Sequence, residues 1–162
     1  MMTQKHQAGF SLIELLIVVG IIGIISAIAI PNLLSSRRAA NEGSALATMR
    51  IIYSAEATYR STRGAGQYGS LAGLSSEGLV DSVVAGSAPK SGYTFAADQV
   101  TSTAFSAFDA TAIPAIYSGS MATGSRSFFV NETGVIMYAL GSTAPTCAAD
   151  DTRAVTGGTP LN

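Results

Sequence analysis

Few residues in this chain are of the types that carry out chemistry. Among its 162 residues, His6 is the sole histidine and Cys147 the sole cysteine. A single histidine near the start excludes most acid–base and metal chemistry, and a single cysteine allows neither an internal disulfide nor a cysteine-based metal site. Glycine-rich phosphate loops and nucleophile motifs are also absent from the sequence. We therefore predict no catalytic residue, no cofactor and no resident metal, and a membrane-anchored enzyme has little support.

The adjacent acids Asp150 and Asp151 are the one candidate for a cation site. Calcium takes about 6–8 oxygen ligands, and no further acidic residues accompany this pair in the sequence. The pattern favours a solvated tail, and we expect disorder from Thr156 to Asn162.

Glu14 is the most informative residue by its position, because a long apolar run follows it. Residues 15–36 contain no charged side chain, and Arg37 and Arg38 come directly after them. About 20 helical residues cross the roughly 30 Å hydrocarbon core of a bilayer, so this run is long enough to span a membrane. An unpaired acid in a spanning segment costs on the order of 2.5–3.5 kcal/mol. Its presence therefore needs a reason.

The composition is unlike that of an ordinary soluble domain. The chain is 48% hydrophobic and only 12% charged, with a net charge of −1. Residues 64–162 hold three basic and seven acidic side chains, a net charge of −4. A protein that binds nucleic acid by neutralising phosphates needs a basic excess, so no nucleic-acid partner is predicted.

Three interpretations fit a leader with Lys5 followed by an apolar helix. A secretory signal peptide would be cut at the Ala-x-Ala site of residues 27–29, but the apolar run continues past that site and exceeds the usual apolar region of about 7–15 residues. A plain single-pass anchor fits the length and leaves Glu14 unexplained. The third interpretation comes from the residues around Glu14.

Residues 9–14 read Gly-Phe-Ser-Leu-Ile-Glu, which strongly resembles the cleavage signature of type IV prepilins. The resemblance implies that a prepilin peptidase cuts after Gly9 and that Phe10 becomes the N-methylated first residue. Unlike a signal peptide, the apolar helix would stay on the mature protein. Pro31 lies at the family's usual kink position, and we adopt this interpretation over the other two.

For Glu14, the resemblance implies a role in assembly. Cleavage would leave a charged amine on Phe10, and the amine of a neighbouring subunit would neutralise Glu14 inside a bundle of parallel helices. Either charge alone would be costly to bury, whereas the pair offsets part of that cost and sets the stagger between subunits. Alternatively, Glu14 only marks the peptidase site.

The resemblance also divides the chain into four segments. They are a removed leader (1–9), a membrane-spanning and filament-core half of a long helix (10–36), an amphipathic half (37–63) and a C-terminal head (64–162). Gly20 and Gly23 allow close approach of a neighbouring helix. Pro31 removes one helical hydrogen bond and should kink the helix.

The amphipathic half presents Leu46, Met49, Tyr53 and Ala57 on one face, and we expect this face to pack on the head. Glu56 and Arg60 are spaced for a favourable i, i+4 ion pair.

The head reads as helical turns followed by strands. We expect turns near residues 70–74 and 77–84, and strands at 93–96, 104–112, 127–130 and 135–138, the last two joined by a turn that ends in Gly134. The fold class is therefore α+β, the pilin fold, with one long N-terminal helix packed on an antiparallel sheet of three or four strands. The disulfide loop of many pilins is excluded, because Cys147 has no second cysteine to pair with.

The resemblance implies a structural subunit of a type IV pilus, polymerised with copies of itself through the N-terminal helix. Its implied partners are the prepilin peptidase and the assembly machinery of the bacterial inner membrane, and its final location is the extracellular filament. The alternative is a pseudopilin of a type II secretion system, but the Tyr-Pro-Thr element of the main pseudopilins reads Tyr68-Gly69-Ser70 here. Adhesion, twitching motility and DNA uptake are family roles among which the sequence does not choose.

Overall fold

The computed structural model describes residues 9–101, 106–150 and 152–161, so most of the predicted leader, residues 1–8, lies outside the described residues. The chain forms two compact units, one ending at Ser36 and one beginning at Arg37. Helix α1 (Leu12–Thr62) contributes to both units. Among the described residues it is the one helix long and apolar enough to cross a membrane, with a mean hydropathy of 2.8 over its most apolar 18 residues.

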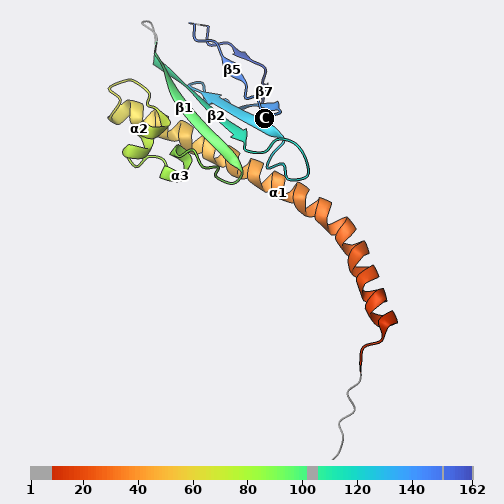
Figure 1. Cartoon of the computed structure of the whole chain (residues 1–162). Helices are drawn as coiled ribbons and strands as arrows, with labels where there is room; N and C mark the ends of the chain where they lie inside the picture. The colour runs from red at the N-terminus through yellow and green to blue at the C-terminus, as the bar shows by residue number, and fades with distance from the viewer. Residues whose placement is uncertain (1–8, 102–105, 151, 162) are drawn as a thin grey trace, which may run out of the picture. The chain divides into compact units, whose positions relative to one another are not determined.

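The second unit consists of the C-terminal half of α1, two short helices and an antiparallel sheet (Figure 1). The short helices are α2 (Leu71–Ser76) and α3 (Ser82–Ala85). The main sheet has the order β1-β2-β3-β4-β7, and its strands are β1 (Tyr93–Thr101), β2 (Ser106–Pro114), β3 (Arg126–Asn131), β4 (Met137–Leu140) and β7 (Thr159–Pro160). The predicted α+β fold, one long helix on an antiparallel sheet, is confirmed.

The sheet buries a small core against the helix. β1 pairs with β2 along its whole length, and β3 lies at the centre of the sheet. Phe128 and Val130 on β3 belong to the same core as Met49 and Ile52 of α1. Phe129 between them points to the other face and is 1% exposed, because successive strand residues alternate in direction. Both faces of the central strand are therefore covered.

The expected buried face of α1 was wrong in part. Of the four predicted residues only Met49 is buried, whereas Tyr53 and Ala57 are exposed and Leu46 is partly buried. The buried residues of α1 are Glu42, Ala45, Thr48, Met49, Ile52, Ala55 and Glu56. Small alanines let the sheet approach the helix closely, and two acids share this face. The positions of the large apolar side chains alone therefore do not identify the buried face of α1.

The C-terminal segment is also ordered, which corrects the expected disorder from Thr156 onward. β5 (Thr146–Cys147) pairs with β6 (Val155–Thr156) in a second sheet. β7 pairs with β4 and adds a fifth strand to the main sheet, where three or four strands were expected. Backbone hydrogen bonds to a sheet edge hold this segment, and small polar side chains give little sign of such bonds in the sequence.

The other predicted elements agree with the structure apart from their ends. The β3–β4 turn contains Gly134 at a φ of +76°, as expected of a turn glycine. β4 begins two residues later than expected, at Met137. The expected second strand matches β2 from Ser106 onward, and its predicted first residues, 104–105, lie outside the described residues. Of the helical turn expected at 77–84, only the last residues are helical, in α3, which begins at Ser82.

Candidate functional site

The first unit exposes nearly all of its apolar surface. Every Phe, Leu, Ile and Val from Phe10 to Leu33 is exposed, from 44% for Val18 to 84% for Phe10. Contiguous apolar surface of this extent marks contact with lipid or with protein. A single copy of the chain supplies neither, so this helix requires a bilayer or other helices around it.

The predicted processing and assembly residues lie at the free end of this helix. Gly9 and Phe10 precede α1, and Glu14 lies in its first turn, where an acid is favoured by the positive end of the helix dipole. The predicted pair between Glu14 and the Phe10 amine joins two chains, so it stays a prediction.

The three residues predicted to shape the helix all lie within α1. A side chain placed at Gly20 or Gly23 would meet nothing within 4 Å. An apolar hollow of about 490 Å³ lies beside Gly20 and is lined by Leu12, Leu15, Leu16, Val19 and Gly20. Pro31 is inside the continuous helix. The glycines thus leave open space at the surface of α1, and the close approach of a neighbouring helix stays a prediction.

In the second unit, Glu42 fastens the helix to the start of β3. Its Oε1 accepts hydrogen bonds from the Ser125 backbone N–H at 2.8 Å and from the Ser125 hydroxyl at 2.7 Å. Its Oε2 pairs with Arg126, with the Nη2 atom 2.7 Å away. Burial alone would raise the pKa of Glu42, but the hydrogen bonds from Ser125 and Arg126 outweigh it, and the pKa is lowered. This carboxylate is therefore charged and fully partnered.

Glu56 fastens the far end of the helix to the loop before α2. Its Oε2 accepts a hydrogen bond from the Gly69 backbone N–H at 2.9 Å. The side chain is fully buried and its Oε1 has no partner. Burial raises the pKa of Glu56 to about 7, although the bond from Gly69 lowers it in part.

The predicted Glu56–Arg60 ion pair does not form. Arg60 instead donates to the carbonyl of Gly66 at 3.0 Å and to the hydroxyl of Tyr68 at 3.1 Å. Glu56 is turned into the core and Arg60 lies at the surface. Helical spacing allows the pair, but packing of the helix on the head separates the two side chains.

The raised pKa of Glu56 predicts stability that falls as pH rises. Between its ordinary pKa of about 4.5 and its folded value of about 7, the folded state holds a proton that the unfolded state has lost. The free energy of unfolding should decline by on the order of 3 kcal/mol across this range and then level off. In Glu56→Gln this decline should vanish, as measured by urea unfolding of the detergent-solubilised protein from pH 5 to pH 8.

The matched control is Glu77→Gln. The Glu77 side chain is 36% exposed and pairs with Arg63 at the surface, so this variant should keep the slope of the unchanged protein. An unchanged slope in Glu56→Gln would contradict the assignment.

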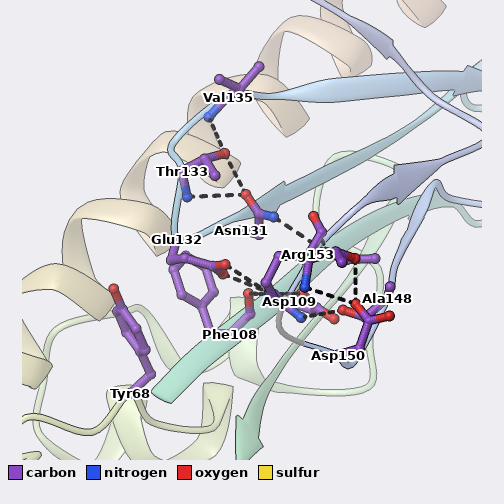
Figure 2. A network of polar contacts seen from close by, with 12 residues as sticks. Tyr68, Phe108, Asp109, Asn131, Glu132, Thr133, Val135, Ala148, Asp150 and Arg153 are labelled. Atoms are coloured by element: carbon purple, nitrogen blue, oxygen red, sulfur yellow. Dashed lines mark hydrogen bonds and ion pairs between the residues drawn. The ribbon is translucent and has the colours of Figure 1, made fainter. Parts of the chain in front are cut away.

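Arg153 lies at the centre of a polar network that joins three parts of the head (Figure 2). Its Nε and Nη2 donate to the two carboxylate oxygens of Glu132, at 2.8 and 2.9 Å. Nη2 also pairs with Asp109 on β2, and Nη1 donates to the carbonyl of Ala148 at 3.2 Å. The Arg153 side chain is only 10% exposed. Hydrogen bonds to Glu132 and to Asp109 raise the pKa of Arg153 despite its burial.

This network closes the C-terminal loop without a disulfide. Cys147 is a free cysteine; its thiol donates to the carbonyl of Arg153 at 3.2 Å, and the Asn131 amide lies 3.6 Å from its sulfur. Burial raises the pKa of Cys147, which disfavours the reactive thiolate. Cys147 is thus part of the packing of this loop.

Of the two adjacent acids considered as a cation site, the structure describes only Asp150. The Asp150 carboxylate accepts hydrogen bonds from Thr152 within a local turn, and Asp151 lies outside the described residues. Among the residues that the structure does describe, no group of three or more His, Cys, Asp or Glu side chains is arranged to hold a metal.

Sequence reasoning missed Glu42, Glu56 and Arg153 as anchors of the head. One signal was available for the two acids, since they are 14 residues apart and four helical turns take about 14.4 residues. They therefore lie near one face. For Arg153 no local signal exists, because its acidic partners lie 21 and 44 residues away.

Comparison with known proteins gives matches to short parts of the chain. Residues 4–30 match the family model of the prokaryotic N-terminal methylation motif. A stretch of 55 residues, 34% of this chain, is 42% identical to the type IV major pilin protein PilA of Myxococcus xanthus and covers 25% of that relative. A stretch of 38 residues, 24% of the chain, is 55% identical to the type IV wide pilus major component PilA4 of Thermus thermophilus and covers 29% of it. The matches thus span less than a third of either relative, and no solved structure matches the chain.

Proposed function

We propose that this chain is the structural subunit of a type IV pilus, because residues 4–30 match the N-terminal methylation motif and parts of the chain are similar to two type IV pilus subunits. The observation that carries the proposal is the exposed apolar half of α1, which follows the Gly9–Glu14 signature. Its role is structural rather than catalytic. The helix would cross the bacterial inner membrane first and lie in the filament core afterwards.

In the proposed sequence of events, prepilin peptidase cuts after Gly9 and Phe10 is N-methylated. The assembly machinery of the inner membrane then adds the subunit to a helical filament of identical copies. Lipid around the apolar half of α1 is exchanged for packing against neighbouring helices, with the space beside Gly20 available for close approach. Pairing of Glu14 with the Phe10 amine of a neighbour sets the register, and the heads form the filament surface.

A pseudopilin of a type II secretion system is the second candidate, because it would use the same N-terminal half. The sequence Tyr68-Gly69-Ser70 lacks the Tyr-Pro-Thr element of that group. Here Gly69 supplies the backbone N–H that binds Glu56, a contact that proline at this position would remove. Filaments on the cell surface would support the pilus, and filaments confined to the periplasm would support the pseudopilin.

The proposal is tested by the first residue and the mass of the mature protein. Removal of 9 of the 162 residues should leave 153, beginning with methylated Phe10. Gly9→Val should abolish this cleavage because the peptidase site is lost. Gly23→Ala should not, since a side chain there meets nothing within 4 Å. A mature chain that begins at Ile30 would indicate a secreted protein, and an intact Met1 would indicate a plain anchor.

A further inference from the structure

The loop between β2 and β3, residues 115–125, is hydrogen-bonded to α1 where that helix enters the second unit. Arg38 donates to three carbonyls of this loop, those of Gly119 at 3.0 Å, Ser120 at 3.3 Å and Ala122 at 3.2 Å. Asn41, one turn later, donates to the carbonyl of Thr123 at 2.9 Å. The loop therefore has a defined place beside Arg38.

The same loop presents large apolar side chains to the outside. Ile116 is 44% exposed, Tyr117 45% and Met121 76%. The exposure does not come from a loose loop, because Thr123 closes it with a backbone hydrogen bond of 2.7 Å to Ile116. Its hydroxyl also donates to the carbonyl of Gly92 at 2.7 Å. An ordered loop that exposes apolar side chains is typical of a surface that contacts a membrane or another molecule.

The charges around this loop differ from those of the rest of the head. Residues 64–162 carry a net charge of −4, yet between Asp109 and Glu132 the only charged residue is Arg126. Arg38 lies beside the loop on the helix, and Arg37 precedes it in the sequence. Glu42, the acid next to them, is occupied by Ser125 and Arg126. This end of the head is thus basic and apolar, which complements an anionic surface.

Chain connectivity places the loop close to the membrane in the precursor. Arg38 comes two residues after the uncharged run that ends at Ser36, so it lies about 3 Å beyond the end of the span along the helix. The headgroup layer on each side of the hydrocarbon is about 5–8 Å thick. Because the Arg38 side chain contacts the loop carbonyls directly, chain connectivity keeps the loop near the membrane surface.

We propose that the β2–β3 loop is a membrane-docking surface, in which Ile116, Tyr117 and Met121 enter the interfacial layer of an anionic bilayer while the subunit awaits assembly. This inference rests on the proposed membrane-inserted subunit. Tyrosine is favoured at membrane interfaces because its ring is apolar and its hydroxyl is polar. Arg37 and Arg38 attract the anionic headgroups. The contact holds the head against the membrane and is released when the subunit is extracted.

Because the chain contains no tryptophan, one introduced tryptophan reports on its own surroundings. The full chain with Met121→Trp is reconstituted in vesicles of phosphatidylcholine and phosphatidylglycerol, with lipids brominated near the headgroup end of the acyl chains. The tryptophan emission should shift to shorter wavelength and be quenched by the brominated lipid. Both effects should weaken when phosphatidylglycerol is left out.

The matched control is Val135→Trp, at a position 48% exposed in the β3–β4 turn. This turn packs beside Tyr53, which is 15 residues beyond Arg38 and about 22 Å along the helix. Its emission should be unshifted and unquenched. A second variant, Tyr117→Trp with Met121→Asp, should lose much of the quenching of Tyr117→Trp alone, because the new charge opposes entry into the interface.

Two results would overturn the inference. One is an unquenched Met121→Trp in vesicles where protease protection shows that the helix is inserted. The other is a blue shift without quenching by brominated lipid that disappears on dilution of the protein, which would assign the loop to a second copy of the chain. Failure of the helix to insert at all would instead refute the proposed function itself, so the two failures are distinguishable.

Discussion

Replacing Glu14 by leucine is expected to leave processing intact and to abolish filament assembly. In the proposed core, loss of the carboxylate leaves the Phe10 amine of a neighbour buried without a partner. Removing one member of a buried ion pair costs about 3–5 kcal/mol, which is about two to four orders of magnitude in the affinity of one subunit for the next. The processed subunit should accumulate in the membrane. Mass spectrometry of the membrane fraction should detect the mature protein, and electron microscopy of the cells should detect no filaments.

Two control variants separate charge from shape. Glu14→Gln keeps the size of the side chain without its charge and should also fail to assemble. Ser11→Ala changes another polar residue just before the helix and should assemble normally. If Glu14→Leu were processed and gave normal filaments, the pairing would be refuted. If it were left unprocessed, Glu14 would belong to the peptidase site instead.

Arg153→Met is expected to produce the largest loss of stability in the head. Glu132 and Asp109 would be left without their shared cation in a place where their side chains are only 23% and 27% exposed. The carbonyl of Ala148 would also lose its donor. By analogy with other broken buried ion pairs, the free energy of unfolding should fall by about 3–5 kcal/mol. Urea unfolding of the detergent-solubilised chain measures this directly.

Arg63→Met is the matched control for this prediction. The Arg63 side chain is 69% exposed and pairs with Glu77 at 3.2 Å, and exposed ion pairs contribute about 0–1 kcal/mol. Equal losses in the two variants would contradict the role assigned to Arg153.

Glu132 and Glu56 should respond to pH in opposite ways. Burial alone would raise the pKa of Glu132, but its hydrogen bonds with Arg153 outweigh this effect and lower it. Its contribution is therefore present above the ordinary value of 4.5 and is lost as the pH falls below it. Glu56 has the opposite sign, because its stabilising contribution is greatest at low pH and is lost as the pH rises toward 7. The Arg153→Met variant should lose less stability at acid pH, with the part due to Glu42, whose pKa is also lowered, remaining. It should keep the loss near neutrality.

Features that depend on neighbouring residues were predictable. The apolar run, the α2 turn and the turn glycine Gly134 each follow from a short stretch of chain, and the structure contains all three. The expected Glu56–Arg60 pair is the instructive failure. It was inferred from helical spacing alone, but one face of that helix is covered by the head, and burial of Glu56 outweighs a weak surface attraction.

The sequence by itself determined the apolar N-terminal segment of this protein. A continuous apolar helix of this length needs no distant residue to form or to enter an apolar environment, and the signature from Gly9 to Glu14 is a run of adjacent residues. Only the tertiary structure decided how the head is held together. Arg153 meets acids 21 and 44 residues away, and Arg38 meets a loop more than 80 residues further along the chain. Such contacts form because packing of the sheet on the helix brings these groups together out of water. No pattern among neighbouring residues in the sequence predicts them.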